Sequence, residues 1–482
     1  MRGQEKTAAI NLRKPILFTI GVYILAIVLF YFLAGEQLHF RKSRGDIELL
    51  QAESGTVELV QGSSVEQIFV PKIQRLKTCS VQWGSYMRSN AGIATIELLD
   101  TRNSSVLMRR QVDVSTITEG TMIELAADDP IETVYGVPLM LRITADSVAG
   151  TAASPLMSVS VQREGETLLL NGVKKEGTLC FSVSGEDYIW TGLHYWEITA
   201  VGGALLLICC GIVAYRANKG KRSYIVNALV AVQKYRFLIR QLVSRDFKTK
   251  YKRSVLGVLW SFLNPLLMMS VQYFVFSTIF KTDIPNYPVY LLIGIISFNF
   301  FSEACGMALT SILGNAALIT KVYMPKYIYP LTKVISSVVN LAISLIPLVL
   351  VMVFTGVQFE KSAILSVFFL VCLIIFSLGL GMLLSAAMVF FRDTQFLWGV
   401  FSMLWMYATP IFYPETILPE NFRFILEVNP LYHFLKYMRM CILEGISPEP
   451  MMYVQSLLMA LAMLLVGALV FRKSQDRFVL HL

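Results

Sequence analysis

The sequence predicts an α-helical polytopic membrane protein with about eight transmembrane helices and an inserted all-β domain. Of its 482 residues, 55% are hydrophobic and only 16% are charged, and the mean hydropathy is +0.59. A soluble globular chain carries more charge than this. A bilayer-spanning helix needs about 20 mostly apolar residues. The segments that qualify are 15–34, 194–215, 255–280, 288–313, 328–355, 363–390, 395–413 and 451–471.

The first apolar segment is expected to be an uncleaved anchor rather than a signal peptide. The run Ile16–Leu33 is long for a signal-peptide core, and no clear small-residue cleavage site follows it. Prolines inside later spans, at Pro265, Pro330 and Pro347, are compatible with spanning because neighbouring helices can satisfy the freed backbone groups.

Basic residues predict the orientation of the spans. The stretch Arg216–Arg253 holds twelve Lys and Arg residues against one acid, Asp246. The 314–327 loop and the C-terminal tail 473–482 add more, whereas the alternate loops are poorer in them. Such residues accumulate on the cytoplasmic side, so both termini are predicted to be cytoplasmic and residues 36–192 extracytoplasmic. The net charge of +9 then reflects topology and contact with anionic lipid, and nucleic-acid binding is not needed to explain it.

Residues 36–192 read as a β-sandwich. Short runs of alternating apolar residues are separated by clusters of Gly, Asn, Asp and Ser, with no helical pattern between them. The runs are 66–70, 77–83, 93–99, 106–112, 139–144, 158–162 and 179–183.

Two questions about this domain concern its aromatic residues and its cysteines. Trp83, Tyr86 and Trp190 could stack on a glycan, but Trp83 shares a strand face with apolar neighbours and is better read as a core residue. Cys79 and Cys180 could form a disulfide on the outer side. Their strand faces differ, which argues against the bridge. The other cysteines lie in or near spans and read as small apolar residues.

A surface helix is predicted before the third span, within a cytoplasmic segment 221–254. Apolar residues recur at helical spacing between Tyr224 and Lys248, and basic residues fall elsewhere on the wheel. Such a helix lies along a membrane surface. The alternative is a juxtamembrane helix that only anchors the chain.

Residues for catalysis or metal binding are not arranged in any known pattern. The four histidines are scattered without ligand spacing. Gly172, Gly177 and Thr178 mimic part of a phosphate loop, but the required Lys is missing. The chain is therefore expected to be no enzyme, to hold no metal or cofactor, and not to bind ATP itself.

One intramembrane charge stands out. Glu303 lies about fifteen residues into the fourth span, which corresponds to roughly 22 Å and a position near mid-bilayer. Lys333, in the next span, could reach toward it. A lining or gating pair and a satisfied inter-helix ion pair are equally compatible with this placement.

Aromatic residues form two stripes at helical spacing. Tyr273, Phe276 and Phe280 make the first, and Trp398, Phe401, Trp405 and Phe412, followed by Tyr413, make the second. Such a face could stack on sugar rings and let a polymer slide. Helix packing or interfacial anchoring is the alternative for each single residue.

Ordered motifs in the C-terminal half resemble a known family. They are Arg245–Lys248, Tyr251–Ser254, Leu256–Trp260, Asn264–Leu266, Phe276–Ser277, Ile279–Lys281, Tyr290–Gly294, Phe300–Glu303, Asn315, Leu318–Ile319, Lys321–Pro325, Phe390–Asp393, Thr409–Pro414, Leu418–Pro419 and Asn429–Tyr432. Together they resemble type-2 ABC permeases that export bacterial O-antigen, capsule and teichoic-acid polymers. The resemblance covers roughly 240–475, about half of the chain.

This resemblance implies a permease rather than an enzyme. The family's members are homodimers in the bacterial cytoplasmic membrane that export a lipid-linked polysaccharide. They work with two copies of a separate ATPase subunit, which holds ATP and Mg²⁺. The resemblance implies an interface helix in 221–254, a six-helix core 255–472 and a tail 473–482. The apolar segments and the strand pattern before them predict an anchor within 1–35, the β domain 36–192 and a second anchor 193–220.

The resemblance also assigns residues to roles. The interface helix and the start of the core carry Arg245, Asp246, Lys248, Tyr251, Lys252 and Arg253. The loop that docks on the ATPase carries Asn315, Lys321, Val322, Tyr323, Met324, Pro325 and Lys326. The intramembrane charge and the aromatic residues described above, rather than the resemblance, supply the candidates for lining the channel, which are Tyr273, Phe276, Glu303, Trp398, Phe401, Trp405, Phe412 and Tyr413.

The first 220 residues depart from the short members of this family. The added anchors and β domain leave the core orientation unchanged, and the domain is hypothesised to receive or guide the emerging glycan. A membrane glycosyltransferase or flippase-like protein acting on lipid-linked sugars is an alternative, but the 281–288 loop offers only Asp283 as an acid. An envelope sensor is another, and it leaves the core motifs unexplained.

Overall fold

The computed structural model describes residues 13–45, 47–132, 134–218, 232–252, 254–279, 284–321, 324–417 and 419–481. Arg253, Phe280, Val322, Tyr323 and the start of the predicted surface helix, 224–231, lie outside them. The chain divides into two compact units, one formed by the residues up to Leu38 with 195–482, the other by His39–His194. This division moves the predicted domain limits, 36 and 192, by two or three residues.

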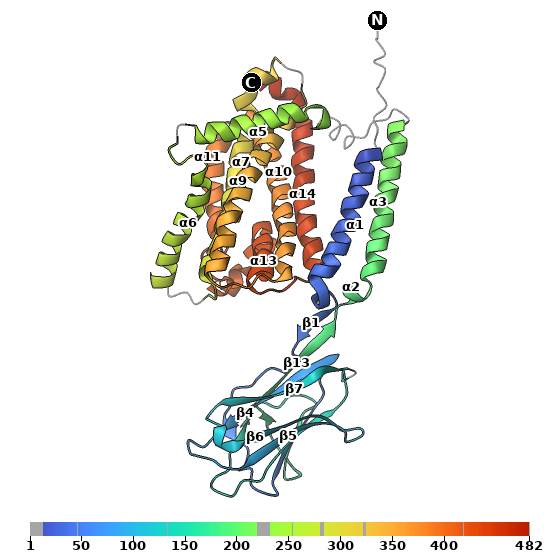
Figure 1. The fold of residues 1–482 in the computed structure, drawn as a ribbon, viewed down its shortest axis with the longest axis vertical. Coiled ribbons are helices and arrows are strands. Elements are labelled where there is room, and N and C mark those ends of the chain that lie inside the picture. The colour runs from blue at the N-terminus through green and yellow to red at the C-terminus, as the bar shows by residue number, and fades with distance from the viewer. Residues whose placement is uncertain are drawn as a thin grey trace. The chain divides into compact units, whose positions relative to one another are not determined.

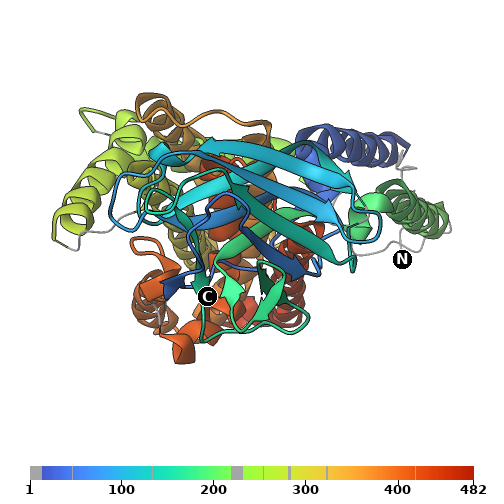
Figure 2. The same ribbon diagram turned by 90° about the horizontal axis from the view of Figure 1, so that it is seen from below.

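The His39–His194 unit is a sandwich of two antiparallel sheets (Figures 1 and 2). One sheet has the order β1-β13-β4-β9-β12, with β2 on β9 and β7 on β4, and the other has the order β11-β10-β3-β8-β5-β6. The strands are β1 Phe40–Ser43, β2 Ser54–Gly55, β3 Ser64–Phe69, β4 Arg75–Gly84, β5 Ile93–Asp100, β6 Val106–Asp113, β7 Thr121–Glu132, β8 Leu139–Ala145, β9 Ser154–Ser158, β10 Thr167–Leu170, β11 Val173–Lys175, β12 Thr178–Leu179 and β13 Phe181–Tyr188.

The alternation of apolar residues explains how these strands pack. In β3, every second residue is buried, and Phe69 is fully so. Because side chains alternate between the faces of a strand, each sheet turns one apolar face toward the other. Trp83 lies fully buried in this core, as its strand position predicted, and the predicted all-β sandwich is confirmed.

One predicted strand is wrong. The run 158–162 is not a strand, because β9 ends at Ser158. The amides of Val159 and Ser160 donate instead to the Glu53 carboxylate, at 2.9 and 3.0 Å. A side chain thus takes the hydrogen bonds that a neighbouring strand would have received.

The cysteines of this unit are both free and buried. Cys79 pairs with Val183 across β4 and β13, whereas the Cys180 carbonyl accepts the Gln82 amide at 2.9 Å. The two residues therefore lie at different levels of the sheet, in line with the argument against a bridge. Burial raises the pKa of Cys79 to about 12, and burial, with a contribution from Glu53, raises that of Cys180 to about 11.

The other unit is helical. Its main helices are α1 Arg13–Ala34, α3 Tyr195–Asn218, α5 Arg236–Tyr251, α6 Leu259–Phe274, α7 Tyr287–Leu309, α9 Ile328–Phe354, α10 Ser366–Phe390, α11 Thr394–Ala408, α13 Pro430–Leu443 and α14 Pro450–Ser474. Its shorter elements are η1 Gly35–Leu38, η3 Val275–Ile279, η4 Leu313–Asn315, α8 Ala316–Ile319, η5 Lys361–Leu365, η6 Glu415–Ile417, η7 Glu420–Phe422, α12 Arg423–Val428, η8 Gln475–Arg477 and α15 Phe478–His481. The short helix α2 Trp190–Leu193 belongs to the His39–His194 unit.

Seven helices in the described residues are long and apolar enough to span a membrane. The eighth predicted span, 395–413, is helical only as α11, which has 15 residues and a length of about 22 Å. It ends at Ala408 because Pro410 disfavours a helical backbone at Thr409, which is extended with φ −105° and ψ 129°.

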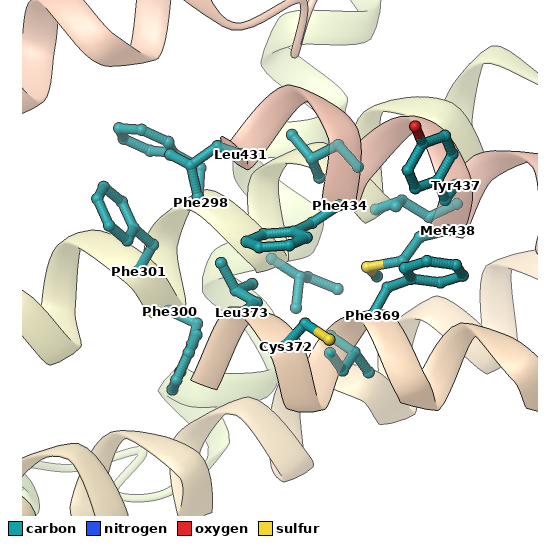
Figure 3. Packing of buried hydrophobic residues seen from close by; sticks show 14 of the residues in the cluster. Phe298, Phe300, Phe301, Phe369, Cys372, Leu373, Leu431, Phe434, Tyr437 and Met438 are labelled. Carbon is teal, nitrogen blue, oxygen red and sulfur yellow. The ribbon is translucent and has the colours of Figure 1, made fainter. Parts of the chain in front are cut away.

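The core of this unit is centred on α7. In its most apolar stretch, 72% of α7 is buried inside the structure, against none of α1 or α3. Figure 3 shows Phe301 of α7, Phe369 of α10 and Phe434 of α13 pointing into one apolar cluster. Helices α10 and α14 approach most closely at Gly379 and Gly467, where there is no room for a side chain, since a Cβ on Gly467 would lie 1.9 Å from the Gly379 oxygen.

The first anchor is packed on this core. Phe30 of α1 lies 4.9 Å from Tyr453 of α14, ring centre to ring centre. Just beyond α1, the Gln37 side chain donates to the Gly445 carbonyl at 3.3 Å and accepts the Ser447 amide. Tyr23 joins α1 to α3 by donating to the Thr199 carbonyl at 2.7 Å. The N-terminal extension therefore contributes a helix pair to the membrane unit.

Candidate functional site

Helix α5 lies across the ends of the bundle helices (Figure 1). Ile239 and Leu242 are buried, and Ile239 joins a cluster that includes Met324, Phe471 and Phe478. Basic side chains such as Arg240 and Lys248 remain exposed. The predicted amphipathic helix is therefore present from Arg236, with its apolar stripe on the bundle.

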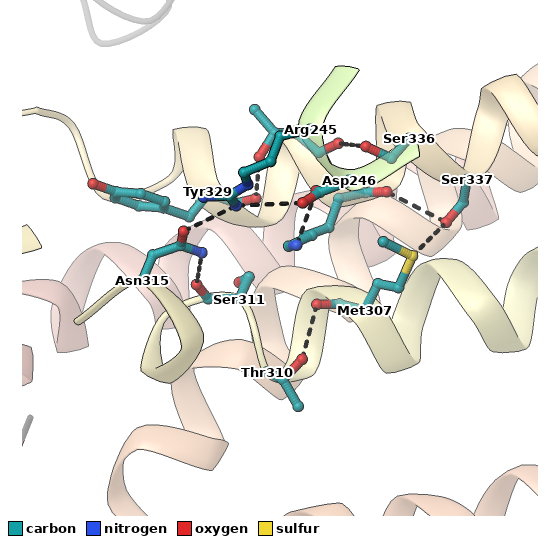
Figure 4. Close-up of polar contacts among 11 residues, drawn as sticks. Arg245, Asp246, Met307, Thr310, Ser311, Asn315, Tyr329, Ser336 and Ser337 are labelled. Atoms are coloured by element: carbon teal, nitrogen blue, oxygen red, sulfur yellow. Dashed lines mark hydrogen bonds and ion pairs between the residues drawn. The ribbon is translucent and has the colours of Figure 1, made fainter. Parts of the chain in front are cut away.

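Polar contacts tie α5 to two other elements (Figure 4). Asp246 forms an ion pair with Lys333 of α9 at 2.8 Å. Arg245 contacts Asp246 and donates to the Asn315 side-chain oxygen, both at 3.3 Å. The Asn315 amide in turn donates to the Ser311 carbonyl at 2.7 Å. A shift of the 311–315 segment would therefore move α5 directly, through the hydrogen bond between Asn315 and Arg245.

Glu303 pairs with α5 and not with Lys333. The Lys250 ammonium lies 2.7 Å from Glu303 Oε1, which also accepts the Asn340 amide at 2.7 Å. The prediction that Lys333 reaches Glu303 is wrong, because Asp246 takes Lys333. Along α7, which ends at Leu309, Glu303 lies about 9 Å from that end of the helix.

Three cavities follow one face of α7. The first, about 420 Å³, includes Met307 and Glu303. The second, about 320 Å³, shares Glu303 with it and reaches Asn299. The third, about 170 Å³, shares Asn299 and reaches Ile295 and the turn at Phe412. Residues 307, 303, 299 and 295 are four apart, so they lie on one side of the helix.

Polar side chains line the middle cavity, although apolar helices surround it. They are Lys250, Tyr251, Ser261, Asn264, Asn299, Glu303, Ser337, Asn340 and Ser344. Tyr251 donates to the Asn340 side-chain oxygen at 3.1 Å. Hydroxyl and amide groups of this kind bind sugar hydroxyls and water well. The cavity is thus a polar space inside a largely apolar bundle.

Helix α7 packs closely against its neighbours at Gly294. A Cβ there would lie 2.9 Å from the Ile411 side chain and 3.0 Å from an Arg439 guanidinium nitrogen. Beyond this point a further cavity of about 420 Å³ opens, lined by Asn286, Tyr290 and Arg439 among others.

The aromatic candidates are divided between the core and the cavities. Trp398 and Trp405 pack edge-on against Phe301, and Trp405 donates to Asn429 at 2.8 Å. Phe276 and Phe412 stack at 5.8 Å and line the third cavity.

The other aromatic candidates lie apart from this stack. Phe401 is 53% exposed, Tyr273 is 42% exposed, and Tyr413 donates to the Tyr407 carbonyl at 2.5 Å. The predicted stripe is therefore not one continuous face.

The residues predicted to dock on an ATPase differ in exposure. Lys321 is exposed and Pro325 half-buried. Asn315 and Met324 are buried, and Lys326 donates to the Gln475 carbonyl at 2.5 Å. Of those described, Lys321 is thus the most available to a partner.

Sequence reasoning missed Lys250, Asn299, Asn340 and Arg439. Lys250 was hidden in a run of basic residues that topology alone explained. The asparagines carried a usable signal, since amides are costly in apolar spans unless they are bonded or hydrated. In the described part of the chain, no group of three or more His, Cys, Asp or Glu residues could hold a metal.

Comparison with known proteins relates the helical bundle to one transporter family. Residues 238–443 match the model of the ABC-2 type transporter family. The chain is 30% identical to the O-antigen export system permease protein RfbA of Klebsiella pneumoniae over 246 residues, 50% of this chain and 93% of the relative. For the RfbA protein of Myxococcus xanthus the identity is 32%, over 51% of this chain and 95% of the relative.

A more distant relative has a related name. The polysialic acid transport protein KpsM of Escherichia coli is 24% identical over 49% of this chain and 93% of its own length. The relatives are thus covered almost completely, whereas half of this chain has no counterpart in them.

Proposed function

This chain belongs to the ABC-2 type transporter family as a permease related to the O-antigen exporters, and we propose that it exports a lipid-linked polysaccharide or teichoic-acid-like polymer across the bacterial cytoplasmic membrane. The proposal fits a multi-pass membrane protein with seven long apolar helices in its described residues. It extends to this chain what the names of the relatives state for them.

The line of cavities along α7 is the observation that carries this proposal. A polymer rich in hydroxyl groups pays a large desolvation cost in hydrocarbon. Glu303, Asn299 and Asn340 supply polar contacts inside the bundle, and the stacked rings of Phe276 and Phe412 follow farther along. Tyr273, Phe401 and Tyr413, the remaining aromatic candidates of the channel, would face it only in an assembled transporter.

The energy source would be a separate ATPase. Two copies of the ATPase subunit, with ATP and Mg²⁺ bound, would dock near Lys321 on a homodimer of the permease chain. The clamp between Arg245, Asp246 and Asn315 would pass movement of the docking loop to α5. Exposed apolar side chains on α6 and α11, such as Phe274 and Val400, offer surfaces for lipid or for a second copy.

The orientation follows from the basic residues near α5. Both termini would lie in the cytoplasm and the β unit outside, where it would receive or guide the emerging glycan. Of the three aromatic candidates in this unit, Tyr86 and Trp190, at 44% and 65% exposure, remain available for stacking on sugar rings.

ATPase activity of the reconstituted complex tests the function. We expect a lipid-linked polysaccharide to raise the ATPase activity of the complex between the wild-type chain and its ATPase. Glu303→Gln leaves Lys250 without its carboxylate in a partly solvated site, a loss on the order of 1 kcal/mol, and should lower this stimulation several-fold. The swapped pair Lys250→Glu with Glu303→Lys should restore part of it.

Glu197, on the exposed face of α3, supplies the matched control, and Glu197→Gln should leave the stimulation unchanged. If no lipid-linked polysaccharide stimulates the wild-type complex, the exporter function is wrong. If Glu303→Gln behaves as the wild type, the cavity is not the path.

A further inference from the structure

Arg439 is a buried cation in the membrane unit. It lies on α13 and is 7% exposed, and its guanidinium carbon lies 3.4 Å from the centre of the Tyr290 ring. Among the described residues, no carboxylate lies within ion-pair distance of it. An unpaired buried charge is costly, so the site needs a source of compensation.

Backbone carbonyls supply part of this compensation. Nη1 donates to the Pro410 carbonyl at 2.7 Å, and Nη2 donates to the carbonyls of Tyr290 and Ile411 at 3.2 and 3.1 Å. A guanidinium has five N–H groups, so three bonds leave two groups over. One of these is on Nε, which is buried and has no hydrogen-bond partner in the described part of the chain.

Arg439 lines the cavity of about 420 Å³ beyond Gly294. The other charges on this cavity are Lys436, Glu415 and Glu444. Lys436 and Glu415 neutralise each other, since the ammonium lies 3.2 Å from both carboxylate oxygens. Glu444 is exposed. Glu415 also attracts the Arg439 guanidinium at longer range, but the guanidinium is the charge in the buried part of the cavity that has no direct ion pair among the described residues.

The amino end of α7 faces the same cavity through Asn286. Asn286 caps the helix in a left-handed conformation with φ 50° and ψ 42°. The amino end of a helix carries a partial positive charge that favours anions. Pro288 has no N–H group, and the Val289 and Tyr290 amides donate to the Asn286 carbonyl at 3.0 and 3.2 Å, so the contribution of α7 is that of its helix dipole. The dipole of α7, a helix of 23 residues, thus adds to the positive electrostatic potential that Arg439 creates in the cavity.

We propose that this outer cavity is an anion-binding site, in which Arg439 receives a phosphate or carboxylate group carried by the exported polymer or its lipid. Guanidinium groups bind such oxyanions strongly. The buried Nε, which has no hydrogen-bond partner in the described part of the chain, shows that the protein itself does not fully satisfy the guanidinium. The identity of the ligand rests on the proposed function. The argument that the cavity binds an anion does not, because it comes from the charges that line the cavity.

Binding to the full chain in nanodiscs of neutral phosphatidylcholine tests the site without ATP or an ATPase. Farnesyl diphosphate should bind at least about tenfold more tightly than farnesol, the gain of a charge-assisted contact. Arg439→Gln should remove this preference. Arg423→Gln, an exposed arginine of the neighbouring α12, is the matched control and should keep it.

Competing probes identify the source of the anion. Displacement by inorganic phosphate indicates a site for free phosphate, and displacement by phosphatidylglycerol alone indicates a lipid headgroup. Displacement by glucuronate but not glucose indicates an acidic sugar. Each of these results supports an anion site.

Equal binding of farnesyl diphosphate and farnesol overturns the proposal, as does an Arg439→Gln protein of unchanged melting temperature that keeps the preference. Because Arg439 also holds three carbonyls, the variant could misfold. Cryo-electron microscopy of the wild type saturated with farnesyl diphosphate then decides, since an empty cavity excludes the site. Binding without any ATPase stimulation would instead count against the exporter function.

Discussion

Glu53 shows how one side chain reshapes the β unit. Its carboxylate receives the Val159 and Ser160 amides at 2.9 and 3.0 Å and the Ser158 hydroxyl at 3.1 Å. The Ser160 hydroxyl also donates to this carboxylate. Together these bonds, of which that from the Ser160 hydroxyl has the largest effect, lower the pKa of Glu53. The apolar alternation of 158–162 gave no hint of this contact, because its partner is about a hundred residues earlier in the chain.

The pH dependence of this turn can be measured by hydrogen exchange. A lowered native pKa means that the contribution of Glu53 is present above the usual Glu pKa of about 4.3 and is lost as the pH falls through the native value. Glu53→Gln should speed exchange at Val159 and Ser160 several-fold at pH 7, after correction for intrinsic rates. Glu164→Gln, an exposed carboxylate nearby, should not, and equal protection in both variants would contradict this role.

Single residues also mark the limit of prediction in the membrane unit. The charge of Glu303 was identified as unusual from its apolar surroundings, but its partner was not. Choosing between Lys250 and Lys333 requires knowing that α5 folds back over the bundle, which places Lys250 at 2.7 Å. Sequence distance favoured Lys333, and tertiary structure decided otherwise.

At the scale of elements, apolar length was a good guide to helices and a poor guide to their ends. Span 395–413 was predicted too long because Trp405 and Phe412 continue the apolar pattern past the break at Pro410. Strand β7 was missed because Asp128, Asp129 and Pro130 interrupt its alternation. It forms nevertheless, since it pairs with β4 along most of its length.

The packing of α1 on the core is testable at this scale. A protease site inserted between residues 219 and 231 of the full chain would separate the N-terminal part after cleavage. We expect that part to remain bound in the wild type. Phe30→Ala should release it by removing the contact with Tyr453, and Gln37→Ala should weaken it by removing two hydrogen bonds.

Phe32→Ala is the control, because Phe32 is 70% exposed and lies on the same helix. It should leave the cleaved parts together. Dissociation of the wild-type protein after cleavage would show that α1 is only a tether.

At the scale of the whole molecule, the β unit is the largest addition to the permease. Its two ends meet, since the Ile189 amide donates to the His39 carbonyl at 2.8 Å. A short linker can therefore replace residues 39–194 with both anchors kept. If the unit guides the glycan, this deletion should reduce polymer at the cell surface while ATPase stimulation persists. Unchanged surface polymer would refute the role.

The close approach of Gly379 and Gly467 sets a limit on how such a transporter can move. Two helices whose backbones touch cannot slide by a turn past each other unless they first separate, and separation would open a void in the core. We therefore expect α10 and α14 to act as the stator of each protomer. The displacement of a transport cycle would then fall on the helices α6 and α11, which carry exposed apolar faces.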